Sequence, residues 1–363
     1  MIGLLLLVLA AGPSDDDCLA CHDGVSLGAS IHGQAGLSCV DCHDDLAGLT
    51  DFPHQPRLAP PNCRACHDGA AAKHAAGVHA RALTAGRKGA GCTDCHGAGH
   101  AILPASDPRS PTSHFRVPHT CAQCHSQTRG GLVSRFEDSI HGHALVKSGL
   151  KVAPNCVTCH AAHEIRDPRD PEAPVHRTQI PKTCGSCHAG ILPVYEDSVH
   201  GKAVAGGDVR AAICTDCHSA HEVVGASVPA WKLEVIRECG TCHGQSLKTY
   251  RDGFHGQVTA LGFTRVAACA DCHGSHDILP ASDSRSKVAR ANLVRTCGRR
   301  GQRALRPVRS PCPARRPAAQ RARLLHRPVH EVAAGRRVLL FWAPRGVVVP
   351  AGATRAPSAK ETA

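Results

Sequence analysis

The stretch SVHGKAVAGGDVRAAICTDCHSAHE, residues 198–222, contains the pattern that decides how this chain folds. It holds a His-Gly pair, then Cys-x-x-Cys-His at Cys214, Cys217 and His218, and a further His at His221. Cys-x-x-Cys-His recurs ten times and uses twenty of the 22 cysteines. These cysteines are Cys18, Cys21, Cys39, Cys42, Cys63, Cys66, Cys92, Cys95, Cys121, Cys124, Cys156, Cys159, Cys184, Cys187, Cys214, Cys217, Cys239, Cys242, Cys269 and Cys272. The His residues that follow are His22, His43, His67, His96, His125, His160, His188, His218, His243 and His273.

The spacing of this motif has a mechanical explanation. Two thiols on one turn of chain add to the two vinyl groups of a haem, and the next residue, His, lies under the iron as the proximal ligand. A zinc site, a redox dithiol or a disulfide framework also uses paired cysteines, but none of them requires His at the following position. Ten copies with that His predict about ten covalently attached c-type haems.

The composition points to a cofactor in place of an ordinary core. Only 3% of the residues are aromatic, while the chain has 27 His, 22 Cys, 35 Gly and 25 Pro. Such a chain cannot bury enough of its own side chains to offset the entropy of folding. We therefore expect a mostly irregular fold with short α-helices around a haem core, and almost no β structure. Helices are expected at and after the motifs, for example over 191–205 and 233–254.

The second axial ligand is also predicted to be His. The only Met is Met1, so no site combines His with an internal Met. One candidate set lies upstream of a motif and the other lies three or four residues after a motif His. These distal candidates are His32, His79, His141, His200 and His255 upstream, and His100, His163, His221 and His276 downstream. One further His, from His54, His74, His114, His119, His143 and His176, is needed for the tenth iron.

The motifs are arranged in repeats. The period is about 53–64 residues with two motifs in each, which is typical of stacked arrays. The pairs begin at Cys39/Cys63, Cys92/Cys121, Cys156/Cys184, Cys214/Cys239 and Cys269/Cys297, with one extra motif at Cys18. The chain therefore reads as about five two-haem repeats.

The repeated units resemble a known family. The segments CVTCHAAHE (156–164), CTDCHSAHE (214–222) and CADCHGSHD (269–277), with TCGSCH (183–188) and ECGTCH (238–243), are similar to the doubled-CxxCH and tetrahaem cytochromes of respiratory bacteria. The resemblance covers about residues 15–298. It implies closely packed bis-His haems, attachment of haem after export, and electron relay between membrane quinol-linked proteins and periplasmic or extracellular acceptors.

The two ends of the chain differ from the middle. Residues 1–12 form a short apolar run that reads as an export signal, although no Lys or Arg precedes it. From Gly298 onward the chain carries fifteen Lys and Arg against two acidic residues, so the tail accounts for the positive net charge. A basic tail is one way to bind nucleic acid or an acidic membrane.

We interpret residues 299–363 instead as a frameshifted, disordered tail. Arg, Pro, Ala, Gly and Val dominate it, as they do when GC-rich DNA is read in the wrong frame. Read one nucleotide later with free third bases, residues 329–350 can encode a Lys followed by about 18 apolar residues, the signature of a membrane span. The unshifted gene is then expected to encode an eleventh haem site and a membrane anchor. On this hypothesis no nucleic-acid partner is expected.

The leading functional hypothesis is electron transfer in a bacterial respiratory pathway by an exported, periplasmic protein. It would be anchored to the inner membrane if the frame were intact, or face the cell exterior. Expected partners are other redox proteins, such as a quinol-oxidising cytochrome b and periplasmic or extracellular acceptors. The alternative is a multihaem reductase of a small oxyanion or sulfur compound, which needs one open iron. A third hypothesis is a haem store or a filament subunit. The leading hypothesis, electron transfer, requires no catalytic residues, and none are predicted.

Overall fold

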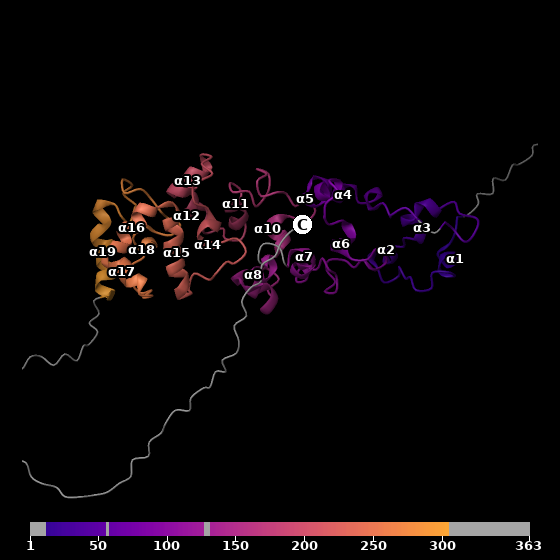
Figure 1. Cartoon of the computed structure of the whole chain (residues 1–363), viewed down its shortest axis with the longest axis horizontal. Helices are drawn as coiled ribbons and strands as arrows, with labels where there is room; N and C mark the ends of the chain where they lie inside the picture. The colour runs from indigo at the N-terminus through magenta and orange to yellow at the C-terminus, as the bar shows by residue number, and fades with distance from the viewer. Residues whose placement is uncertain (1–11, 56–57, 127–130, 305–363) are drawn as a thin grey trace, which may run out of the picture. The chain divides into compact units, whose positions relative to one another are not determined.

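The computed structural model describes residues 12–55, 58–126 and 131–304, which belong to one compact unit, Met1–Arg306. Within these ranges every regular element is a helix and none is a strand, which confirms the prediction of a helical chain with almost no β structure. Helices that are close in sequence pack against each other, as α15 with α16 and α16 with α17 (Figure 1). Most of the predicted export segment and of the tail lies outside the described residues.

The helices are short and separated by irregular chain. The α-helices are α1 Asp15–Leu19, α2 Ile31–Gln34, α3 Cys39–Cys42, α4 Asp68–Ala76, α5 Val78–Thr84, α6 Cys92–His96, α7 Val117–His125, α8 Leu132–Asp138, α9 Ile140–Gly142, α10 Cys156–His160, α11 Ile180–Gly185, α12 Leu192–Glu196, α13 Val199–Ala205, α14 Cys214–His218, α15 Pro229–Cys242, α16 Gly244–Asp252, α17 Phe254–Ala260, α18 Cys269–His273 and α19 Leu293–Ala304. The single turns of other helix types are η1 Asp44–Leu46, η2 Cys63–Ala65, η3 Gly99–Ala101, η4 His143–Lys147 and η5 Arg290–Asn292.

The two helices expected over 191–205 and 233–254 are each interrupted. Ser198 is extended (ψ 165°) and separates α12 from α13, because its hydroxyl accepts the N–H of Gly201 and so begins a new helix. The second expected range is divided among three helices, α15, α16 and α17, because α15 ends before His243 and α16 ends before Gly253. The prediction of continuous helices was therefore wrong. At Ser198 a cap hydroxyl ends one helix and starts the next, whereas the breaks at His243 and Gly253 have no side-chain cap.

The residue before the second cysteine explains why several motifs form a single helical turn. In α6 the Asp94 carboxylate accepts the N–H of Gly91 at 2.7 Å, and in α14 Asp216 accepts the N–H of Ile213 at 2.8 Å. Thr158 does the same for Asn155 in α10, at 3.1 Å. These side chains supply half of a capping box, which satisfies a donor that the helix itself leaves unpaired. In these motifs the residue at the second x position of Cys-x-x-Cys-His therefore stabilises the helical turn.

The glycine that follows an upstream His is required by close backbone packing. A Cβ on Gly142 or Gly201 would lie 2.0 or 2.1 Å from the carbonyl oxygen six residues earlier, at Phe136 or Tyr195. No side chain fits at that distance, so only glycine lets the two chain segments approach. The His-Gly pair therefore fixes the path of the chain on which the His is presented.

The buried apolar side chains are few and mostly small. The largest fully buried one is Leu145, and the others include Ile213, Ile236 and several alanines. A buried Leu or Ile contributes about 1.5–3 kcal/mol. Among the described residues this core is thin for the length of chain, as the composition predicted.

Candidate metal centres

Five motifs lie on single-turn helices. Helices α6, α10, α14 and α18 each span a complete motif from its first Cys to its His, and in α3 the His directly follows the helix. Residues at i, i+3 and i+4 share one face of a helix. Both thiols and the imidazole of each motif are therefore presented on the same side.

The other five motifs lie at or near the ends of helices. Their first cysteines are Cys18 in α1, Cys63 in η2, Cys121 in α7, Cys184 in α11 and Cys239 in α15. Gly185 and Gly240, each directly after the first Cys, pack so closely that an added Cβ would lie 2.5 and 2.1 Å from a leucine side chain of the following segment. The Gly in Cys-Gly-x-Cys-His therefore lets this segment fold back against its own helix.

Nine of the ten motif His residues face a second His that lies outside the motifs. Ring-centroid separations are 5.9 Å for His22–His54, 6.0 Å for His67–His32, 6.2 Å for His43–His100, 6.3 Å for His125–His79, 6.1 Å for His96–His163, 6.2 Å for His188–His141, 6.0 Å for His160–His221, 6.2 Å for His243–His200 and 6.0 Å for His218–His276. Eight of these nine partners belong to the predicted distal set.

These separations are slightly below the space needed for one metal ion between the rings. A metal–imidazole bond is about 2.0–2.1 Å and the ring nitrogen lies about 1.2 Å from the ring centre, so two rings on one ion have centroids about 6.4–6.6 Å apart. Aromatic rings in ordinary contact span a wider range, about 4.5–7 Å. The nine values lie within 5.9–6.3 Å, and each pair joins a motif His to a non-motif His. The residues present therefore fit a haem iron, which takes two axial ligands from the protein.

The pairing follows a rule that the sequence did not reveal. An upstream His pairs with the second motif of its own repeat, as His200 does with His243. A downstream His pairs with the first motif of the preceding repeat, as His276 does with His218. Each such site is therefore shared between two consecutive repeats.

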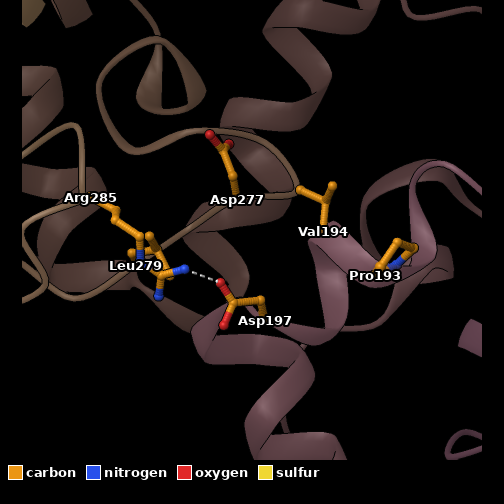
Figure 2. A pocket seen from close by; sticks show the side chains of 6 residues that line it. All are labelled: Pro193, Val194, Asp197, Asp277, Leu279 and Arg285. Atoms are coloured by element: carbon orange, nitrogen blue, oxygen red, sulfur yellow. Dashed lines mark hydrogen bonds and ion pairs between the residues drawn. The ribbon is translucent and has the colours of Figure 1, made fainter.

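A backbone hydrogen bond couples the two kinds of distal His. The N–H of the residue before each of the first four upstream His residues donates to the carbonyl two residues after a downstream His. The four bonds are Ile31–Ile102 at 2.8 Å, Val78–Ile165 at 2.7 Å, Ile140–Val223 at 2.8 Å and Val199–Ile278 at 2.9 Å. At the last junction Arg285 also donates to Asp197 at 2.6 Å, across a pocket lined by Pro193, Val194, Asp277 and Leu279 (Figure 2).

Sequence reasoning left the tenth partner open among six His residues. The structure brings His54 to His22, although His54 lies outside the repeated contexts that identified the other candidates. Four of the alternatives make hydrogen bonds elsewhere: His74 with the Ala90 carbonyl at 2.8 Å, His114 with the Ala153 carbonyl at 2.9 Å, His143 with the Lys147 ammonium at 2.9 Å, and His176 with the Thr178 hydroxyl at 2.9 Å.

Two predicted ligands are not brought to another His ring within the described residues. They are the motif residue His273 and the upstream residue His255, whose ring contacts only Phe254 in this way. Both side chains are exposed. By the rule of the preceding repeats, His255 would serve a second motif at Cys297, where the chain reads Cys-Gly-Arg-Arg-Gly.

Burial favours the ligand form of the paired imidazoles. Desolvation, followed by the neighbouring ring, lowers the pKa of the motif residues His96, His160 and His218. The same causes lower the pKa of the upstream residues His79, His141 and His200. A lowered pKa keeps imidazole neutral at physiological pH, and the neutral form is the one that binds metal.

Consecutive motifs are linked by their thiols. First cysteines lie close enough together for one thiol to raise the pKa of the other in the pairs Cys18–Cys39, Cys63–Cys92, Cys121–Cys156, Cys184–Cys214 and Cys239–Cys269. Second cysteines interact electrostatically with the next motif in the pairs Cys42–Cys63, Cys95–Cys121, Cys159–Cys184 and Cys217–Cys242. No disulfide joins two described cysteines. All ten motifs thus form one uninterrupted series.

The described residues contain no group of three or more His, Cys, Asp or Glu side chains arranged to hold a metal ion, so the candidate centres are pairs. No described helix has both the length and the apolar character needed to cross a bilayer. Comparison of the chain with protein-family models, with curated proteins and with solved structures gives no match.

Proposed function

We propose that this chain is a multihaem c-type cytochrome that carries electrons along ten covalently attached haems. The observation that supports this most directly is the set of nine His–His pairs, each spaced for one iron and each built from one Cys-x-x-Cys-His motif and one distant His. Neither a zinc site nor a redox dithiol accounts for a second His at this distance from every one of nine motifs.

Each group of residues has a role in this proposal. The two thiols of a motif would hold the porphyrin as thioethers, and the motif His and its partner His would supply the two imidazole ligands of the iron. In eight of the nine pairs, a backbone bond between repeats fixes the segment that carries the partner His. Bound haem supplies reversible one-electron chemistry at the iron, with a low potential expected for two imidazole ligands.

The thiol contacts between consecutive motifs support a relay. Thioethers formed at Cys121 and Cys156, or at Cys184 and Cys214, would bring the attachment edges of neighbouring porphyrins together. The protein contributes spacing, burial and hydrogen bonding, which tune the potentials. No acid, base or nucleophile is needed for this function.

The proposed setting is outside the cytoplasm. The family resemblance implies attachment of haem after export, and electron exchange with other redox proteins, such as a membrane quinol-oxidising cytochrome b and periplasmic or extracellular acceptors.

The test is a haem count on the full chain, produced with a c-type maturation system and measured as pyridine haemochrome. We expect about ten haems per chain and a predominantly low-spin visible spectrum. The variant Cys214→Ala/Cys217→Ala should carry nine, whereas the control Cys297→Ala should still carry ten because Cys297 lies outside a complete motif. A chain without covalent haem would refute the proposal.

A second candidate function is reduction of a small oxyanion or sulfur compound. It requires an iron with an open coordination position, and His273 is the observation that favours it, because no His ring faces it among the described residues.

A further inference from the structure

The residue that directly follows the motif His has an unusual backbone conformation after four of the single-turn helices. After α10 it is Ala161, with φ 64° and ψ 172°, and after α14 it is Ser219, with φ 58° and ψ 174°. Gly97 and Gly274 occupy the same position with φ 90° and 93°. This backbone region is essentially restricted to glycine, and another residue there is strained unless its surroundings hold it. Among the described residues, only Ala161 and Ser219 have a positive φ without being glycine.

The turn at Ser219 lies between two imidazoles that face different partners. His218 faces His276 at 6.0 Å. His221, three residues later, faces His160, also at 6.0 Å. If α14 continued as a helix, residues three apart would share one face, and His221 would lie beside His218 instead. The conformation of Ser219 therefore directs the two rings to two separate sites.

Both ends of this turn are fixed, which explains why the strain persists. Before it, the Asp216 carboxylate accepts the N–H of Ile213 at 2.8 Å and holds the helical turn of α14. After it, the carbonyl of Val223 accepts the N–H of Ile140 at 2.8 Å, which joins the chain to the preceding repeat. The side chain of Ser219 is itself exposed. A substitution at this position therefore acts through the backbone and not through packing.

The same arrangement occurs one repeat earlier. The ring of His160 faces His221, whereas His163 faces His96 at 6.1 Å. Ala161 lies between His160 and His163 in the chain. Three consecutive sites are therefore connected in series, and each connection is one strained turn that carries an imidazole for both of the sites that it joins.

On the basis of the proposed function, we infer that Ser219 and Ala161 are positioning residues that each control two consecutive haem irons. Ser219 directs His218 to the iron of its own motif and His221 to an iron of the preceding repeat. Ala161 does the same one repeat earlier. A change in either turn therefore alters two haems at once, although neither residue is itself a ligand.

The experiment compares Ser219→Val with Ser219→Gly in the full chain, with total haem counted as pyridine haemochrome. A β-branched residue strongly disfavours positive φ, so valine should release the turn. We expect one haem to become high-spin through loss of His221, and a second to change its low-spin EPR signal through reorientation of His218. Glycine accepts the conformation without strain, so Ser219→Gly should keep the EPR spectrum of the unaltered chain. It should also raise the denaturant midpoint, because the strain relieved exceeds the entropy that an added glycine costs.

Neighbouring and ligand variants separate the inference from general damage. Ala220 is also exposed but has no positive φ, so Ala220→Val should change no haem and Ala220→Gly should lower the midpoint. His221→Ala should change one haem only, at the site of His160. A Ser219→Val protein that changes no haem, or only the haem that His221→Ala changes, would overturn the inference and leave the proposed function intact. A lowered midpoint for Ser219→Gly would also overturn it, without any disruptive variant, whereas an unaltered chain without covalent haem would overturn both.

Discussion

Replacing Gly201 by alanine should displace the second imidazole ligand of one proposed haem, although Gly201 is not itself a ligand. The glycine is buried on α13, directly after the distal residue His200. An added Cβ would lie 2.1 Å from the Tyr195 carbonyl oxygen and 2.7 Å from the Glu196 Cα. Both obstacles are backbone atoms, so no side-chain rotation relieves the contact.

The size of the effect follows from these distances. Reaching an ordinary contact of about 3.2 Å requires the two segments to separate by about 1 Å, whereas a metal–ligand bond tolerates only about 0.2 Å. The His200–His243 separation of 6.2 Å therefore cannot be kept if α13 moves as a unit. Forced overpacking of this kind costs about 1–3 kcal/mol of folding free energy. Compared with the unaltered chain, about one haem in ten should change from low-spin to high-spin.

The assay is the high-spin ferric fraction and the carbon monoxide stoichiometry of Gly201→Ala, at an unchanged haem count. Gly190→Ala is the matched control, because a Cβ at Gly190 meets no atom within 4 Å. A Gly201→Ala protein with the spectrum of the unaltered chain would show that α13 yields without moving His200, and would refute the reasoning.

Three other substitutions test separate features. Trp231 stacks on the His218 ring at 5.4 Å and 11°, so Trp231→Ala should free the orientation of that imidazole and change the low-spin EPR signal of one haem, at a loss of about 0.5–1.5 kcal/mol of pairing energy. Asp216→Ala should lower the denaturant midpoint through loss of a helix cap, an effect of about 0.5–2 kcal/mol on unfolding free energy. Arg285 holds the pKa of Asp283 at about 2, below its ordinary 3.8. A depressed carboxyl pKa stabilises the fold above pH about 4, and this contribution is lost as pH falls toward about 2. Asp283→Asn should therefore reduce the drop in thermal midpoint over that range.

Controls separate these effects from general damage. Lys232→Ala alters the residue next to the stacked Trp and should leave the EPR signal unchanged. Asp216→Asn keeps a cap acceptor but loses the charge that pairs with Arg177 at 2.6 Å, so it should lie between the original and alanine proteins. An acid profile of Asp283→Asn that matches the unaltered chain would assign the acid sensitivity to other carboxylates.

The single-turn geometry of several motifs, and the absence of strands from the part of the chain that the structure describes, could be predicted because both depend on local pattern. Cys214, Cys217 and His218 lie within one turn, and their geometry follows from that turn. The ring pairs could not be predicted from such a pattern, because His276 reaches His218 across a repeat boundary. His54 was not singled out because no repeated context marks it. The break at Ser198 was missed because a cap hydroxyl competes locally with the continuation of a helix.

The sharing of sites between repeats has a consequence for how the protein is made. The two rings of a shared site are separated by 57 to 67 residues, as for His43 with His100 and His96 with His163. A chain that emerges from a membrane N-terminus first cannot close such a site until the following repeat has also emerged, a delay of about 3–13 s at ordinary rates of synthesis. The shared sites would therefore be completed one after another, and the site formed most recently would lack its second imidazole until the next repeat emerged. A chain that stops early is left with one such waiting site at its growing end.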